Sequence, residues 1–141
     1  MKVFSVSEAN ALLPRLNVLV ARQLTLVRDL DAVTTALTAH GVDSRSLEPQ
    51  DGDSPEVLEL KRQLKVPVNE LRDLWREIEA TGVVVKDVRQ GLVDFHGRLE
   101  GNAVWLCWRY GETQVAHWHP MDQGFEARRP LPRESIPPTL N

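Results

Sequence analysis

The stretch that decides the fold runs from Gly91 to Leu131 and reads GLVDFHGRLEGNAVWLCWRYGETQVAHWHPMDQGFEARRPL. It holds three of the four tryptophans, three of the four histidines and the only cysteine of the 141-residue chain. Short runs of β-branched and aromatic residues separated by glycine-containing turns are typical of an antiparallel sheet. The residue types that carry chemistry are therefore concentrated in one small sheet, and a functional site is expected there.

Four strands are expected in this part of the chain, at residues 83–88, 91–95, 103–109 and 114–119. The segment 96–102 contains two glycines and is predicted to be a hairpin loop. Pro120 is predicted to end the sheet because proline cannot donate a ladder hydrogen bond. Residues 121–131 are expected to form an irregular closing loop.

Residues upstream of the sheet show helical periodicity. From Leu12 to Leu37 a seam of residues, apolar except for Gln23, alternates in steps of four and three, which predicts a helix with a narrow apolar seam. Ser7 is the predicted N-cap, and Gly41 is predicted to end the helix. Pro14 is expected to kink or restart it, because proline clashes with the preceding turn.

A second helix is predicted between Ser54, a suitable N-cap, and Gly82. Its apolar seam runs from Val57 to Ile78, and Pro67 inside it is expected to bend it. Each helix has a single apolar stripe, so the two should pair antiparallel across the polar connector 42–53.

The predicted fold class is therefore α+β, with a long kinked antiparallel helical hairpin packed on a small antiparallel β-sheet. Residues 1–131 are expected to form a single domain, with the hairpin at 1–82 and the sheet and closing loop at 83–131. A proline-rich tail is expected at 132–141.

Charge and composition exclude several functions. The net charge is −3, and neither half of the chain carries a surplus of lysine and arginine, so nucleic-acid binding is not expected. No apolar run is long enough to span a bilayer, and the first residues lack the features of a signal peptide. A single cysteine excludes an internal disulfide framework. A cytoplasmic location without membrane association is expected.

The register of the last hairpin decides which polar residues share a face, because a one-residue slip moves every side chain of a strand to the other face. A two-residue loop at Gly111-Glu112 pairs Cys107 with Ala116 and places Cys107 on the face opposite His117 and His119. A three-residue loop pairs Cys107 with His117 and gathers all three on one face. A glycine followed by one residue suits a type II′ turn, so the two-residue loop is favoured.

Both faces of the sheet carry apolar residues that need cover in either register. The helical hairpin can cover one face, and the second needs residues 121–131 or another subunit. A homodimer is the expected assembly.

The pair His117 and His119 is the strongest metal-binding pattern, because residues two apart lie on one side of a strand. Asp94 on a neighbouring strand is the best third ligand, followed by Asp87, Glu112 and Asp122. The candidate metal ligands are therefore Asp94, His119 and His117, with Zn²⁺ as the candidate ion. A packing role for both histidines is the alternative.

Other residues of the stretch have a chemical and a structural interpretation. Arg128 and Arg129 could clamp a carboxylate or phosphate with their forked donors, or could close a loop onto an acidic residue. Trp108 and Trp118 are candidate ligand-binding residues, with core packing as the alternative. Cys107 is predicted to be a buried structural thiol, because a Cys–His nucleophile pair needs the three-residue loop.

Several short blocks are specific in combination: Glu8 to Pro14, Lys86-Asp87, Gly91 to Phe95, Leu106 to Arg109, Gly111-Glu112, Trp118-His119, Gly124-Phe125, Arg128 and Pro130-Leu131. With these blocks the chain resembles, over nearly its whole length, a bacterial family known as domain of unknown function 2203. His96 stands where the family pattern has proline, and Arg129 where it has glutamine. The resemblance implies no activity, but it favours Asp94, Glu112, His119 and Arg128 as site residues over His117 and Arg129.

Two functional hypotheses follow. The leading one is a non-enzymatic, homodimeric interaction or adaptor protein that contacts an unknown protein partner through the hairpin and the aromatic sheet. The alternative is a small metal-dependent enzyme or an enzyme for a small anionic molecule. In that case Asp94, Glu112 and His119 act as ligands or acid–base groups, and Arg128 holds the anion.

Overall fold

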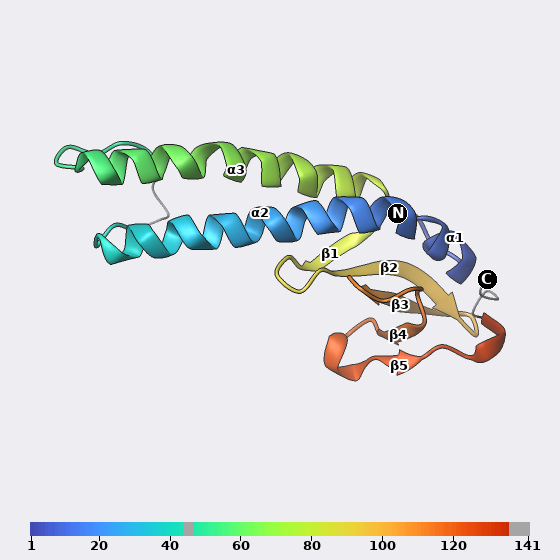
Figure 1. The fold of residues 1–141 in the computed structure, drawn as a ribbon. Coiled ribbons are helices and arrows are strands. Elements are labelled where there is room, and N and C mark those ends of the chain that lie inside the picture. Colours follow the sequence, from blue (N-terminus) through green and yellow to red (C-terminus); the bar gives the residue numbers. More distant parts are fainter. Residues whose placement is uncertain (44–46, 136–141) are drawn as a thin grey trace.

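The computed structural model describes residues 1–43 and 47–135, which form three α-helices and a five-stranded sheet and confirm the α+β class (Figure 1). The helices are α1 (Val6–Ala11), α2 (Leu13–Ala39) and α3 (Pro55–Ala80). The strands are β1 (Val84–Asp87), β2 (Leu92–Leu99), β3 (Asn102–Arg109), β4 (His117–Pro120) and β5 (Arg129–Pro130). Two short 3-10 helices are η1 (Phe125–Ala127) and η2 (Arg133–Ser135). Within the described ranges, no helix combines the length and apolar character needed to cross a bilayer.

The first helix starts earlier than the sequence suggested, at Ser5 and not at Ser7. The Ser5 hydroxyl accepts the Glu8 N–H at 3.0 Å, and the Glu8 carboxylate accepts the Ser5 N–H at 3.0 Å. This reciprocal capping satisfies two backbone donors at once. The chain then breaks at Leu12, and α2 begins with Pro14 in its first turn, where a missing N–H costs no helical hydrogen bond.

The second long helix begins where it was predicted. The Ser54 hydroxyl caps α3 by accepting the Val57 N–H at 3.2 Å, and Pro55 is the first helical residue. The helix continues through Pro67 to Ala80, so the bend expected at Pro67 stays a prediction.

The helices α2 and α3 run antiparallel along their length. Ion pairs between them join Arg15 to Glu77 at 3.2 Å and Arg22 to Glu70 at 2.9 Å. The hairpin extends well beyond the sheet (Figure 1), and its far part has its own small core of Leu37, Val57 and Leu64. The main core lies where the near part of the hairpin meets the sheet.

The sheet is an antiparallel meander in the order β1-β2-β3-β4-β5. The loop predicted at 96–102 is wrong, because β2 continues through Leu99 and only Glu100 and Gly101 form the turn, both at positive φ. Residues 121–131 are not wholly irregular, because Arg129 and Pro130 pair with β4 as a fifth strand.

The pairing of β3 with β4 follows the alternative register, in which Cys107 and both histidines share one face. Cys107 lies opposite His117, and Trp105 lies opposite His119, so the two-residue hairpin loop is wrong. The connection instead spans residues 110–116: it turns between Arg109 and Glu112, whose N–H donates to the Arg109 carbonyl at 3.0 Å. It then reaches α1, where the Asn10 side chain accepts the Val115 N–H at 2.8 Å.

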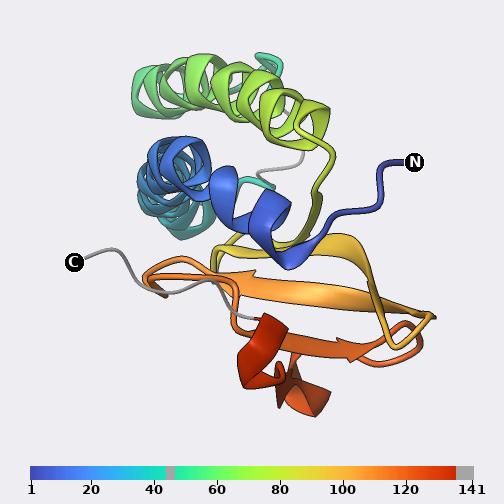
Figure 2. The same cartoon turned by 90° about the vertical axis from the view of Figure 1, so that its right-hand side faces the viewer.

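This register divides the sheet into two chemically different faces. Phe95 and Leu106 pair with each other on the face whose apolar side chains join the main core with α2. Asp94 and Cys107 pair on the other face, away from the helices. The segment with η1 lies on this second side of the sheet (Figure 2).

Cover by residues 121–131 removes the need for a second subunit that the sequence suggested, and homodimer formation stays a prediction. Of the tail expected at 132–141, residues 133–135 form η2, and residues 136–141 lie outside the described part of the chain.

Candidate functional site

Three buried side chains from three neighbouring strands converge on the face away from the helices. Asp94 (β2), Cys107 (β3) and His119 (β4) are each no more than 2% exposed. One carboxylate oxygen of Asp94, the Cys107 sulfur and one ring nitrogen of His119 lie within 4.8 Å of one another. These are three different types of metal ligand in one place.

The hydrogen bonds of His119 fix the roles of its two ring nitrogens. Nδ1 lies 3.1 Å from the Pro120 carbonyl oxygen, which can only accept, so Nδ1 carries a hydrogen. Nε2 lies 2.8 Å from Oδ2 of Asp94. Both Nε2 of His119 and Oδ2 of Asp94 are acceptors when unprotonated, so a proton or another cation is needed between them. His119 therefore presents Nε2 to the cluster and its Nδ1–H to a backbone carbonyl, which is the usual arrangement of a metal-ligating histidine.

The same contacts exclude a thiol nucleophile activated by His119. Both ring nitrogens are engaged by Pro120 and Asp94, so neither is directed at the Cys107 sulfur. Burial, followed by the charge of Asp94, raises the pKa of Cys107 to about 12. Burial also raises the pKa of Asp94, although His119 opposes this effect. Without a further cation, Cys107 stays a thiol at neutral pH.

The cluster forms part of the wall of a pocket of about 250 Å³. Its other wall residues come from the end of β1, the start of β2 and the closing segment: Lys86, Asp87, Leu92, Gln123, Gly124 and Phe125. The three candidate ligands are thus buried in the protein yet border a space that a small molecule can enter.

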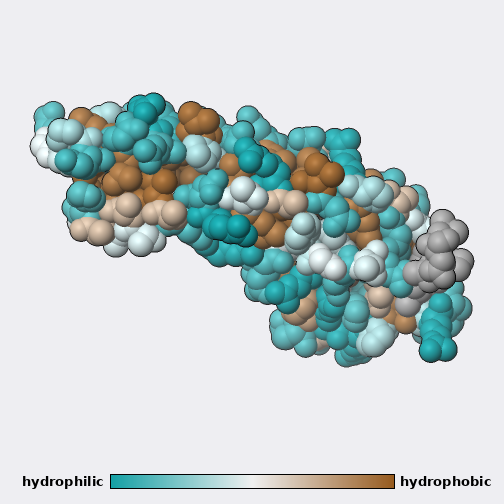
Figure 3. Space-filling model, in the orientation of Figure 1, coloured by the Kyte–Doolittle hydropathy of each residue, from teal (hydrophilic) through white to brown (hydrophobic). Residues whose placement is uncertain are grey.

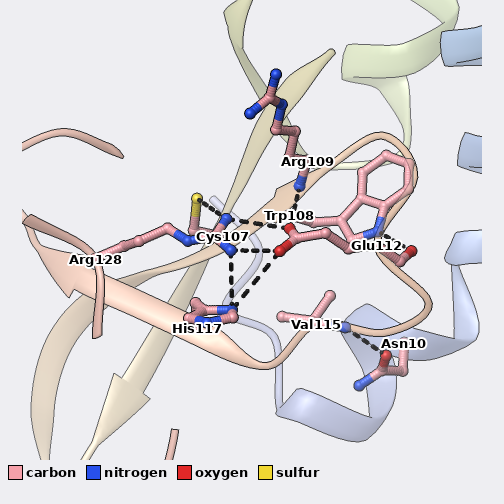
Figure 4. A network of polar contacts seen from close by, with 8 residues as sticks. All are labelled: Asn10, Cys107, Trp108, Arg109, Glu112, Val115, His117 and Arg128. Atoms are coloured by element: carbon pink, nitrogen blue, oxygen red, sulfur yellow. Dashed lines mark hydrogen bonds and ion pairs between the residues drawn. The ribbon is translucent and has the colours of Figure 1, made fainter. Parts of the chain in front are cut away.

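A second polar network includes the Cys107 sulfur and joins it to Arg128, Glu112 and His117 (Figure 4). Arg128 donates to both carboxylate oxygens of Glu112, with Nη1 3.1 Å from Oε1. Its Nη1 also lies 3.8 Å from the Cys107 sulfur, and its Nη2 donates to Nδ1 of His117 at 3.1 Å. Glu112 in addition accepts the Arg109 N–H at 2.7 Å.

The charges of this second network compensate one another. Burial favours a higher pKa for Glu112, but the hydrogen bonds from Arg128 and from the Arg109 N–H outweigh it and lower that pKa. Burial and the Arg128 charge lower the pKa of His117. Arg128 can only donate, so Nδ1 of His117 accepts and the ring is neutral. His117 is thereby engaged outside the cluster.

The structure separates the residues predicted from sequence into two groups. Asp94 and His119 come together as expected, whereas His117, Glu112 and Arg128 form the adjoining network. Trp108 is fully buried in the core on the helix side, and Trp118 packs partly against the same core, with Arg129 over its ring at 5.2 Å. Neither tryptophan lines the pocket.

Sequence reasoning missed Cys107 as a candidate ligand. Cys107 was read as structural because the favoured register placed it on the opposite face from both histidines. The three-residue loop would have revealed it, since that alternative gives the observed pairing of Cys107 with His117. Lys86 and Asp87 could from sequence either do acid–base work or merely end a strand, and the structure places both at the end of β1 in the pocket wall.

The fold and the site define an α+β protein with a buried carboxylate–thiol–imidazole cluster beside a small pocket. The chain belongs to an uncharacterised conserved protein family, DUF2203, whose model matches residues 2–131. No curated protein and no solved structure is significantly similar to it.

Proposed function

We propose that this protein binds one divalent transition-metal ion, Zn²⁺ in the first place, through Asp94, Cys107 and His119, and uses it to act on a small molecule. The convergence of three different buried ligand atoms within 4.8 Å carries this proposal. Thiolate and imidazole ligands together favour zinc over magnesium or calcium, which prefer oxygen ligands alone.

The residues fit such an ion in charge and in orientation. A thiolate and a carboxylate neutralise the two positive charges, and His119 is oriented by its hydrogen bond to Pro120. The ion would replace the proton held between His119 and Asp94. A merely structural role would be served as well by apolar side chains of similar volume.

The number of ligands favours a reactive site over a structural one. Structural zinc sites use four protein ligands, whereas catalytic sites use three and leave a position for water or substrate. In the described part of the chain the cluster has three members and borders a pocket. A zinc ion held there supplies Lewis-acid chemistry at its remaining position.

Metal titration of the purified, chelator-treated chain tests the proposal. We expect one equivalent of Co²⁺ or Zn²⁺ to bind, with a sulfur-to-cobalt charge-transfer band that Cys107→Ser abolishes. Asp94→Asn and His119→Gln should weaken binding by more than the roughly 10–100-fold typical of residues outside the ligand set.

The matched control is His117→Gln, because His117 is two residues from His119 on the same strand face but is engaged by Arg128. It should retain one equivalent of metal and the charge-transfer band. Wild-type protein that binds no metal in the folded state, or a His117 variant that loses it as fully as the His119 variant, would contradict the proposal.

The dimeric adaptor role and the cytoplasmic location stay predictions. Figure 3 shows apolar side chains over the hairpin, and on α3 Val66 is 70% exposed and Trp75 38% exposed. Sedimentation equilibrium tests the assembly: a dimer mass supports the homodimer, and a monomer mass at all accessible concentrations contradicts it.

A further inference from the structure

Lys86 is the feature of the pocket that the metal proposal leaves unused. It is the only lysine or arginine among the described residues that line this space. Its ammonium lies over the Trp105 ring, 4.0 Å from the centroid, so an aromatic contact places the charge beside the site.

No carboxylate of the described residues lies within ion-pair distance of Lys86. The nearby Asp87 is occupied by its own turn, because its carboxylate accepts from the Arg89 N–H at 2.9 Å and the Gln90 N–H at 3.0 Å. Arg128 is neutralised by Glu112. Lys86 is therefore the positive side chain of the pocket that no described carboxylate holds in an ion pair.

The charged side chains of the pocket favour an anionic ligand. A divalent ion with the Asp94 carboxylate, the Cys107 thiolate and neutral His119 is neutral overall, while Lys86 adds one positive and Asp87 one negative charge to the lining. The Asp87 carboxylate is held by N–H groups of its own turn, so Lys86 is the charge with which a bound anion can pair. The volume sets the size, because about 250 Å³ equals the liquid volume of about eight waters, below the usual range for drug-sized ligands.

We infer that the pocket binds a small carboxylate, which takes the open position of the metal and has Lys86 as its counter-charge. This inference rests on the proposed function. The side chains of Leu92 and Phe125 line the same pocket and would contact a short apolar chain attached to the carboxylate.

Acetate titration of the Co²⁺-loaded protein, at constant ionic strength, tests the inference. We expect acetate to shift the visible cobalt bands at saturation. Lys86→Gln should weaken acetate binding about tenfold without loss of the Co²⁺ equivalent, because a charge-assisted contact is lost. Lys86→Arg should retain most of the affinity. Lys65→Gln on α3 is the matched control and should leave the affinity unchanged.

Three outcomes would overturn the inference while the metal site survives. They are Co²⁺ bands that do not respond to acetate, equal acetate affinities in wild type and Lys86→Gln, and tighter binding of inorganic phosphate than of acetate. If the chain binds no Co²⁺ at all, the proposed function fails first. The two failures are thus distinguished by the metal stoichiometry measured in the same samples.

Discussion

Arg128 is the residue that connects the two polar networks of the sheet face. One guanidinium contacts the Glu112 carboxylate, the His117 ring and the Cys107 sulfur. Its charge is balanced by Glu112, so it can hold the thiol side of the cluster in place without adding a net charge. Glu112 therefore positions Arg128 beside the Cys107 sulfur, although Glu112 is not one of the three clustered ligands Asp94, Cys107 and His119.

Replacement of Glu112 by glutamine should lower the free energy of unfolding by about 1–2 kcal/mol at neutral pH, because a partly buried charged hydrogen bond is lost. Burial opposes ionisation of Glu112, but Arg128 lowers its folded-state pKa below the ordinary value of 4.5. The carboxylate thus stabilises the fold above that value, and this contribution is lost as the pH falls through the lower folded pKa.

Urea unfolding of both proteins from neutral to acidic pH measures this effect. The difference between wild type and Glu112→Gln should be largest near neutrality and should shrink in acid. A difference that is independent of pH, or that grows in acid, would show that the Glu112 charge does not stabilise the fold.

The sequence predicted which residues lie together at the site only where the alternation of side chains along a strand decides their face. Strand spacing indicated that His119 and Asp94 could meet, and His119 Nε2 lies 2.8 Å from Asp94 Oδ2. The prediction that their strands are neighbours is wrong, because β3 lies between β2 and β4. The assignment of Cys107 depended on a loop whose length no local pattern determines. Trp108 was a candidate for ligand binding on residue type alone, with core packing as the other interpretation, and it is buried in the main core.

The register of the sheet depends on contacts between elements. The loop at 110–116 is held at one end by Glu112, whose carbonyl accepts the Trp108 ring N–H at 3.0 Å, and at the other by Asn10 of α1. Asn10 lies 105 residues before Val115 in the chain. Local turn preferences predicted a shorter loop and thereby the wrong face for Cys107, because this distant contact does not appear in any short window of sequence.

Substitution of Asn10 by alanine should lower the free energy of unfolding by about 1–3 kcal/mol, because the buried Val115 N–H loses its acceptor. Asn17→Ala is the control. Its side chain donates to the carbonyl four residues earlier, as that of Asn10 does, but among the described residues it makes no side-chain hydrogen bond to a loop of the sheet. Chemical denaturation compares the two. Equal losses would show that Asn10 does not anchor the loop.

The helical hairpin contributes to two separate hydrophobic cores, which have no described residue in common. The main core joins the helices to the sheet, and the far core is surrounded by α2, α3 and the segment before α3. Near the far core, the buried Lys61 ammonium contacts the Asp53 carboxylate at 2.8 Å and the Glu48 carbonyl at 3.1 Å. The periodicity of the sequence predicted both helices, but it did not predict that their outer halves would extend past the sheet.

Lys61→Met should therefore loosen the far end of the hairpin and leave the sheet unaffected, because Asp53 loses its buried partner. Hydrogen exchange should accelerate at the first turns of α3 and remain slow in β2 and β3. Lys65→Met is the control, because the Lys65 side chain is exposed and its ammonium lies 3.5 Å from an exposed Glu48 carboxylate oxygen. Faster exchange throughout the sheet would show that the two cores unfold together.

X-ray absorption at the zinc edge of the zinc-loaded protein shows directly which atoms hold the metal. We expect one sulfur at about 2.3 Å and nitrogen or oxygen ligands at about 2.0–2.2 Å, with the sulfur lost in Cys107→Ser. A bound zinc without any sulfur ligand in the wild-type protein would contradict the assignment of Asp94, Cys107 and His119 as the metal site.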